Sequence, residues 1–226
     1  MSPILSTFSL GRRQTRSSVI TVSYVANAFS STHQITIPAT AQANDIVVIC
    51  WTGRATWSNG PADADPSGWT LIGGDFDSDV VQSNDVNTRF WYKKIISGDV
   101  NSTVTVANSG WNTDVNSLIV LRPSVSATPT VASFSVQSTS GDPTQQTRDG
   151  TAVVTPHATL AFYKSGAAID PRTESSGTFS ELNSGTTNYI KYRIFNTNAD
   201  RISTNIDMAD EGWNGLASCI ISFAKT

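Results

Sequence analysis

The chain has 226 residues, of which 38% are apolar and 15% are charged, with a formal net charge of −3 at pH 7. This length allows one large domain or two small ones with a sizeable core, and the mild acidity excludes a nucleic-acid binder that uses a broad basic face. Ser, Thr and Asn make up about a third of the chain, which is typical of an all-β protein and excludes a helical bundle, and no apolar run approaches the roughly 18 residues of a membrane span.

The first segment, residues 1–18, is expected to be an extended N-terminal arm. It lacks the positive charge followed by an uninterrupted apolar run that marks a secretion signal, so we expect it to be retained. Arg12, Arg13 and Arg16 are the only charged side chains before Asp45, which makes the arm slightly basic. Its two short apolar clusters suit strand addition or docking in a groove, and the three Arg are the candidate anchoring residues. The alternative is a solvated tail without a role.

After the arm, short β-branched and aromatic runs alternate with turn residues, which predicts an antiparallel sandwich or barrel without helices. Two runs, 46–51 and 118–121, are apolar at every position, so we expect them to be buried on both faces. The body, residues 19–226, is predicted to be a jelly-roll-like β-sandwich of about 12–14 strands. The expected strands are 19–25, 33–37, 45–52, 69–72, 88–96, 102–106 and 117–122 in its first part, and 131–137, 151–154, 159–164, 178–182, 189–195, 203–208 and 218–223 in its second part.

The two parts of the body are similar in sequence, which predicts two halves built on one strand order, 19–123 and 130–226. Either each half is a seven-stranded immunoglobulin-like sandwich of its own, or the halves interleave in one larger sandwich. The linker, residues 123–130, contains Pro but no Gly and is short, so we favour a single compact body. Three pairs of segments carry the similarity: 46–53 with 159–166, 67–72 with 176–182, and 102–112 with 203–214.

Two long polar segments of the first half are candidate binding loops, because long loops on a rigid β scaffold commonly carry function. One of them, 54–66, contains Trp57 beside Asn and Asp residues, a combination suited to stacking on a sugar ring and hydrogen-bonding its hydroxyls. A local hydrophobic plug is the alternative role for this Trp. The other segment, 73–87, is acidic and much longer than its counterpart in the second half. The candidate glycan or receptor contacts are Trp57, Asp75, Asp77, Asp79 and Asp85.

The spacing of Asp75, Asp77 and Asp79 matches the opening of a calcium-binding loop. The rest of an EF-hand loop is missing, since Val80 stands where Gly is required and Val86 where Glu is required. A solvated acidic loop is therefore favoured over a calcium site.

The chain offers little catalytic chemistry. His33 and His157 have no neighbouring His, Cys or Glu at metal-ligand spacing, and no Gly-x-Ser-x-Gly segment occurs. With few glutamates, a carboxylate pair of the kind that cleaves glycosides is a weak alternative. Cys50 and Cys219 lie in apolar strands and are expected to be buried free thiols. We therefore predict that the protein is not an enzyme and needs no cofactor or metal.

The remaining Trp residues are expected to be structural. Trp51 and Trp91 lie within predicted strands and should belong to the core. Trp69 follows a Ser-Gly turn, and Trp111 and Trp213 occupy the same Gly-Trp-Asn position in the two halves, so these three are interpreted as corner residues that cap the sandwich.

Several segments together resemble β-sandwich proteins that tailed bacteriophages carry on the virion as fibres, tail-tip or baseplate components, or capsid decorations. The resemblance covers about residues 19–226 and implies a virion structural protein, assembled in the host cytoplasm, that binds other virion proteins and forms a homo-oligomer such as a trimer. The arm looks like the segments by which small phage proteins attach to a larger virion component. The family is defined by its scaffold, so no functional residues transfer. The segments that carry the likeness are DIVVICWTG (45–53), PSGWTLI (66–72), RFWYKKIISGD (89–99) followed by STVTV (102–106), and SLIVLRP (117–123).

Three classes of function therefore compete. The first is a virion structural protein that contacts host-surface glycans through its loops. The second is a carbohydrate-binding module without a virion role, and the third is a β-sandwich enzyme that degrades polysaccharides. Assembly into an oligomer or particle favours the first class, and retention of a monomer on a glycan column favours the second. Release of reducing sugar would be needed for the third.

Overall fold

The computed structural model describes residues 20–55, 65–73, 86–106, 111–139, 145–149, 156–165, 180–184, 188–196, 203–207 and 214–226. Within these ranges the chain forms antiparallel strands and one short turn of 3-10 helix, η1(Ser97–Asp99), so the expected all-β antiparallel fold is confirmed. The strands of the first half are β1(Val22–Ser30), β2(Gln34–Thr36), β3(Ile46–Ala55), β4(Thr70–Gly73), β5(Val86–Lys94), β6(Thr103–Thr105) and β7(Trp111–Pro123). Those of the second half are β8(Ala127–Thr139), β9(Gln145–Asp149), β10(His157–Ser165), β11(Ser180–Ser184), β12(Asn188–Phe195), β13(Ser203–Asp207) and β14(Asn214–Lys225).

Each half forms one five-stranded sheet and one two-stranded ribbon. The first half has the order β1-β7-β3-β5-β4 with the ribbon β2-β6, and the second has β8-β14-β10-β12-β11 with the ribbon β9-β13. The two halves therefore have the same strand order, since adding seven to each strand number of the first half gives the order of the second. The similar sequence segments fall on strands that occupy the same place in the two halves: β3 and β10, β4 and β11, and β6–β7 and β13–β14. Among the described residues, no sheet combines strands of both halves.

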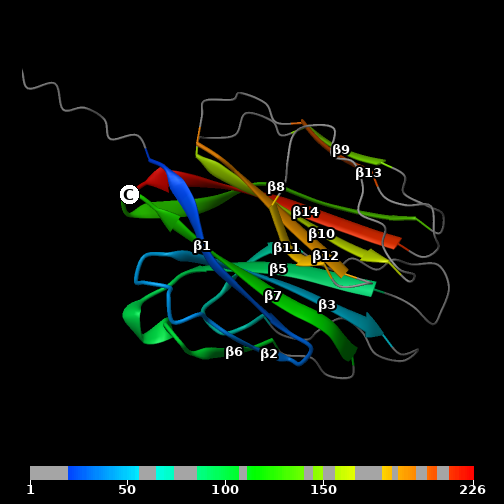
Figure 1. The fold of residues 1–226 in the computed structure, drawn as a ribbon, viewed down its shortest axis with the longest axis horizontal. Coiled ribbons are helices and arrows are strands. Elements are labelled where there is room, and N and C mark those ends of the chain that lie inside the picture. Colours follow the sequence, from blue (N-terminus) through cyan, green and yellow to red (C-terminus); the bar gives the residue numbers. More distant parts are fainter. Residues whose placement is uncertain are drawn as a thin grey trace, which may run out of the picture.

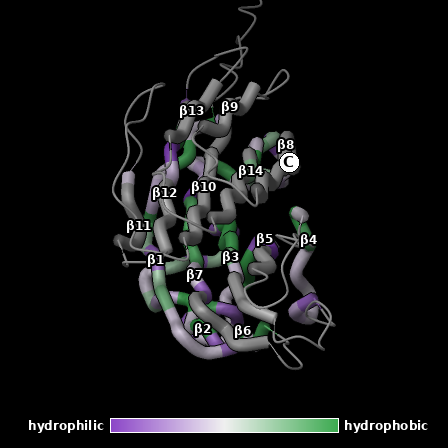
Figure 2. Tube along the Cα trace, turned by 90° about the vertical axis from the view of Figure 1, so that its right-hand side faces the viewer, coloured by the Kyte–Doolittle hydropathy of each residue, from purple (hydrophilic) through white to green (hydrophobic). Residues whose placement is uncertain are grey.

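The two five-stranded sheets pack against each other through one shared core. Strand β1 contacts β12, β5 contacts β14, and β4 contacts β8. The ribbons β2-β6 and β9-β13 lie on opposite outer sides of this pair of sheets (Figure 1). Apolar segments are concentrated on the strands between the two ribbons (Figure 2). The buried residues of the shared core are Val22, Ile46, Val48, Cys50, Phe90, Ile119, Leu121, Ala127, Cys219, Ile221 and Phe223.

A second core lies on the other face of the first sheet, beneath the β2-β6 ribbon. Successive residues of a strand point to opposite faces, so β3 supplies Val48 to the shared core and Ile49 and Trp51 to the second one. This explains why 46–51 is apolar at every position, and its burial on both faces is confirmed. Trp51 and Trp91 are both fully buried in the second core, as expected.

The connection between the halves is shorter than predicted. Strand β7 ends at Pro123 and β8 begins at Ala127, so the link is 124–126 and not 123–130. The misplaced residues belong to β8, because Ala127 is buried in the shared core and Pro129 pairs in register with Phe223. Pro is tolerated there because β8 is an edge strand. Strand β9 was not expected, and the predicted strand at 151–154 lies outside the described residues.

Candidate functional site at the two ends of the body

The chain ends and the link between the halves meet at one end of the body, which we call the terminal end. Val22 at the start of β1 is opposite Pro123 at the end of β7, and Ala127 at the start of β8 is opposite Lys225 at the end of β14. Because only the short link separates Pro123 from Ala127, both pairs lie together (Figure 1). Residue Ile20, where the described chain begins, is therefore at this end too.

The opposite end, which we call the loop end, is where strands β3 and β10 finish. In the first half Ala55 is opposite Trp111, the first residue of β7, and in the second half Ser165 is opposite Asn214, the first residue of β14. Strand β7 has 13 residues. At about 3.4 Å per residue, the two ends are roughly 40 Å apart.

We call Thr21 and Val22, which directly precede and begin β1, the root of the predicted arm; residues of the link and of the second half hold them in place. The Thr21 N–H donates to Ser124 Oγ at 3.0 Å, and the Ser124 N–H donates to the Thr21 carbonyl at 2.8 Å. The next residue, Val22, donates its N–H to Asn196 Oδ1 at 2.7 Å, while Asn196 Nδ2 donates to the Val22 carbonyl at 3.0 Å. The side chain of Asn196 thus pairs with the outer edge of β1 as a neighbouring strand would, and it fixes the backbone of Val22.

We expect Asn196→Ala to lower the free energy of unfolding by about 1–2 kcal/mol, because both backbone groups of Val22 lose a partner. Chemical denaturation would measure the change. Asn196→Asp is the comparison variant: it keeps the acceptor for the Val22 N–H but places a carboxylate oxygen against the Val22 carbonyl, so its loss of stability reports on the lost donor together with that repulsion. Equal stability of all three proteins would show that the amide does not hold the root.

A pair of aromatic rings joins the halves beside this root. Tyr24 of β1 stacks on Tyr192 of β12 with ring centroids 5.1 Å apart and an interplanar angle of 21°. The Tyr24 hydroxyl donates to Asn27 Oδ1. Burial, and to a smaller degree the neighbouring Tyr192, raises the pKa of Tyr24 above its ordinary value. The contact thus holds β1 against the second half just beyond Val22.

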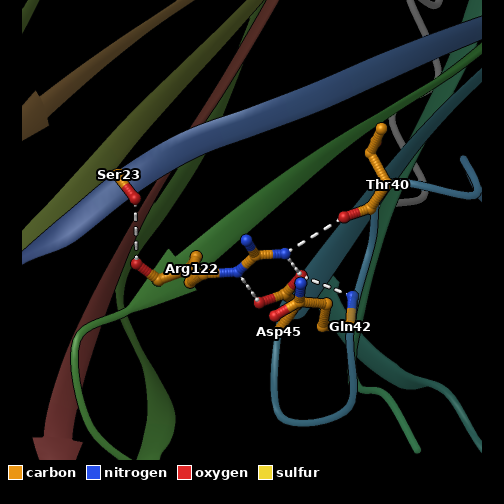
Figure 3. A network of polar contacts seen from close by, with 5 residues as sticks. All are labelled: Ser23, Thr40, Gln42, Asp45 and Arg122. Atoms are coloured by element: carbon orange, nitrogen blue, oxygen red, sulfur yellow. Dashed lines mark hydrogen bonds and ion pairs between the residues drawn. The ribbon is translucent and has the colours of Figure 1, made fainter. Parts of the chain in front are cut away.

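An ion pair lies at the terminal end, between the segment before β3 and the end of β7 (Figure 3). Arg122 donates from Nε to Asp45 Oδ1 at 2.8 Å and from one terminal nitrogen to Oδ2 at 2.7 Å. That nitrogen also donates to the Thr40 carbonyl at 3.1 Å, and the Gln42 N–H donates to Asp45 Oδ2 at 2.8 Å. The hydrogen bonds to Asp45 raise the pKa of Arg122. Both carboxylate oxygens are engaged within the protein, so we interpret this pair as structural.

Ser126 ties the link to both halves at the terminal end. Lys94, the last residue of β5, donates from Nζ to Ser126 Oγ at 2.8 Å. The hydroxyl of Thr226 donates to the same oxygen at 3.0 Å, and the Thr226 N–H donates to the Ser126 carbonyl at 3.3 Å. The C-terminal residue is therefore fixed beside the root of the arm.

The candidate residues named from the sequence lie outside the described residues, but the strand ends that flank them do not. Arg54 of β3 is opposite Val86 of β5. The segment that contains Trp57 therefore leaves β3 next to the point at which the acidic segment enters β5, at the loop end. Asp65 is described, and its carboxylate accepts a hydrogen bond from Trp91 Nε1 at 2.7 Å. The residues outside the described ranges are Arg12, Arg13, Arg16, Trp57, Asp75, Asp77, Asp79 and Asp85.

Sequence reasoning missed the contacts that organise the terminal end. Asp45 and Arg122 are 77 positions apart, and Val22 and Asn196 are 174 apart, so no local spacing pattern links them. The available signal was indirect: Asp45 directly precedes an apolar strand and Arg122 ends one, which leaves two charges beside a core that requires them to pair.

The chain matches no protein-family model, no curated protein and no solved structure. In the described ranges, no group of three or more His, Cys, Asp or Glu side chains could hold a metal ion. Among those same residues, no helix has the length and apolarity needed to cross a membrane. The function is therefore inferred from the placement of the two ends.

Proposed function

We propose that this chain is a structural protein of a tailed-bacteriophage virion, attached to the particle at its terminal end and presenting its loop end outward. The observation that supports this proposal is that the two ends of the body carry different features. The root of the arm, the link between the halves and the C-terminal residue lie at one end, and the strand ends that flank the Trp57 and acidic segments lie at the other. A display protein needs this separation between attachment and contact.

Nested strand pairing within each half supports the jelly-roll-like sandwich that the sequence predicts for the body. In the first half β1 pairs with β7, β2 with β6, and β3 with β5, and the second half repeats this with β8 and β14, β9 and β13, and β10 and β12. A hairpin rolled up in this way is the winding of a jelly roll. Viral capsid and lectin domains use that architecture, which agrees with both roles in the proposal.

The partners in this proposal are other virion proteins at the terminal end and host-surface glycans at the loop end. Arg12, Arg13 and Arg16 assist attachment through the arm, and Trp57 stacks on a sugar. One Trp over one sugar contributes only about 1–2 kcal/mol. Many copies on one particle convert such weak contacts into firm attachment through their effective concentration.

We expect Trp57→Ala, combined with removal of most of 74–85, to reduce adsorption of phage particles to host cells at least about tenfold, because each lost contact is multiplied over many copies. Adsorption kinetics and the amount of this chain per particle would be measured together, and particle assembly should be unchanged. Ser58→Ala, in the same segment as Trp57, is the matched control and should leave adsorption unaffected.

Other outcomes of this experiment would replace the proposal. Particles that form without this chain would remove the virion role, and retention of the monomer on a glycan column would then favour a carbohydrate-binding module. Failure of assembly in the loop variant would make the loop end an interface within the particle. Unchanged adsorption would assign host contact to another protein.

A further inference from the structure

Strand β8 presents a long sheet edge without a charged side chain, although Pro129 and a bulge at 131–133 interrupt the first part of that edge. The four sheet edges of the five-stranded sheets are β1, β4, β8 and β11, of which β4 and β11 have only 4 and 5 residues. The start of β1 is covered by Asn196. Strand β8 has 13 residues, none of them charged, and among the described residues it has a strand neighbour on one side only. Natural edge strands are normally short, charged, covered, or interrupted by Pro or a bulge, because exposed N–H and C=O groups bind further strands. In β8 the uninterrupted part of the edge is therefore the segment after the bulge, from Ser133 to Thr139.

The register identifies the backbone groups of β8 that point away from its sheet. The Phe223 N–H donates to the Pro156 carbonyl at 3.0 Å, on the side of β14 away from β8. Its partner Pro129 therefore directs its backbone outward, where a missing N–H disturbs no pairing within the sheet. A bulge follows. After it Ser133 is opposite Ile220, and the backbone N–H and C=O of Ser133 point toward β14. Alternation then places the N–H and C=O of Val136 on the open edge.

We propose that the N-terminal arm of a second copy of this chain binds along β8 as an additional antiparallel strand. This inference rests on the proposed function, in which the arm serves assembly, and it identifies the surface that the arm binds. Main-chain hydrogen bonds to an exposed sheet edge supply affinity in this mode of recognition.

Strand direction favours the arm over a second body as the occupant. Strands β1 and β8 both begin at the terminal end. Strands β4 and β11 run in the same direction, because their antiparallel neighbours β5 and β12 end at the terminal end. Two copies attached in the same orientation can therefore join their edges only in parallel. The arm is fixed at Ile20, at the terminal end, so when it extends along a neighbouring β8 it runs antiparallel to that strand.

The composition and length of the arm also fit. Its segment LSTFSL (5–10) resembles VASFSV (131–136) of β8, and neither contains a charge. Two uncharged strands can pair without like-charge repulsion. The residues from 10 to 20, fully extended, span at most about 33–36 Å, enough to reach the edge of an adjacent body. The three Arg lie between this segment and the root.

The root and the β8 edge lie on opposite sides of the body, an arrangement that lets the root of one copy lie beside the β8 edge of a neighbouring copy. Strand β1 is the first strand of its sheet, and β4, which contacts β8, is the last. At about 4.8 Å per strand, the root and the β8 edge are roughly 19 Å apart, on opposite sides of the body. When copies surround an axis parallel to their strands, the β1 side of one faces the β8 side of the next. Such head-to-tail contacts close into a ring, of which a trimer is one form.

Light scattering on the purified chain tests the inference. The full chain should form a defined oligomer, whereas deletion of residues 1–18 and the substitution Val136→Pro, which removes one outward N–H of β8, should each give a monomer. As a control, Asn27→Pro introduces a Pro into β1, the other long edge strand, and should leave the oligomer intact. A full chain that is monomeric at all concentrations, or an oligomer that survives either change, would overturn the inference.

Hydrogen exchange provides a second readout that does not depend on the folding of the Val136→Pro variant. In the full chain the amides of β8 should be protected along their whole length. Deletion of the arm should speed exchange of about half of them, the outward-facing ones, at least tenfold, while exchange in β14 stays unchanged. Equal exchange in the two proteins would contradict arm binding at β8. An oligomer that forms as described but is missing from phage particles would refute the proposed function and leave this inference standing.

Discussion

Replacing Phe223 with Ala is expected to lower the free energy of unfolding by about 3–5 kcal/mol. Phe223 is fully buried in the core shared by the two five-stranded sheets, with Val22 and Leu121 of the first half in the same cluster. Removing its ring leaves a cavity between the sheets, because densely packed strands close such a space only in part.

The same substitution tests whether the two halves unfold together. Phe223 belongs to the second half, whereas most of the Trp residues belong to the first, so Trp fluorescence reports mainly on the half that is not changed. If the shared core couples the halves, the midpoints of denaturation measured by fluorescence and by far-UV circular dichroism shift together. The Trp residues of the first half are Trp51, Trp57, Trp69, Trp91 and Trp111.

The neighbouring residue provides the control for this substitution. Ala224 follows Phe223 in β14 and is exposed, so Ala224→Ser should change the free energy of unfolding by no more than about 0.5 kcal/mol. Two separate transitions, with the fluorescence midpoint unchanged by Phe223→Ala, would show that the halves are independent and that the contact between their sheets contributes little stability.

Features governed by neighbouring residues could be predicted from the sequence. The turn in PSGWTLI is one example: the Trp69 N–H donates to the Pro66 carbonyl at 3.0 Å, and Gly68 has a φ of +78°, which disfavours other residues. The continuous apolar run of β3 likewise predicted burial on both faces, because alternating side chains must enter two cores.

The arrangement of the halves depends on long-range contacts that no local pattern encodes. The sequence left open whether the halves interleave, and in the described part of the chain each half keeps its own strands. The linker was predicted at 123–130, but its last part belongs to β8, because an edge strand accepts Pro129 where the backbone faces outward. The binding residues named from composition lie outside the described residues, so Trp57 and the acidic segment remain predictions.

Replacing Arg122 with Met should lower the free energy of unfolding by about 2–3 kcal/mol, somewhat less than the roughly 3–5 kcal/mol typical of breaking a buried ion pair. The Asp45 side chain is only 3% exposed, so its carboxylate would lose its counter-charge without gaining water. The Arg122 side chain is 34% exposed, and this partial access to solvent is why the lower range applies. Met keeps most of the aliphatic stem of Arg, so the measured loss reports on the charge and the hydrogen bonds.

A double-mutant cycle separates the ion pair from the packing around it. Asp45→Asn removes the charge but keeps an oxygen for the Gln42 N–H, so the double variant with Arg122→Met carries no buried unpaired charge. It should be more stable than the sum of the single changes implies, by about 1–3 kcal/mol. Additive effects in urea denaturation would mean that Arg122 acts through its bond to the Thr40 carbonyl and not through Asp45. Since this pair connects the end of β7 to the segment before β3, a large coupling energy would also show that the pair contributes to the stability of the terminal end.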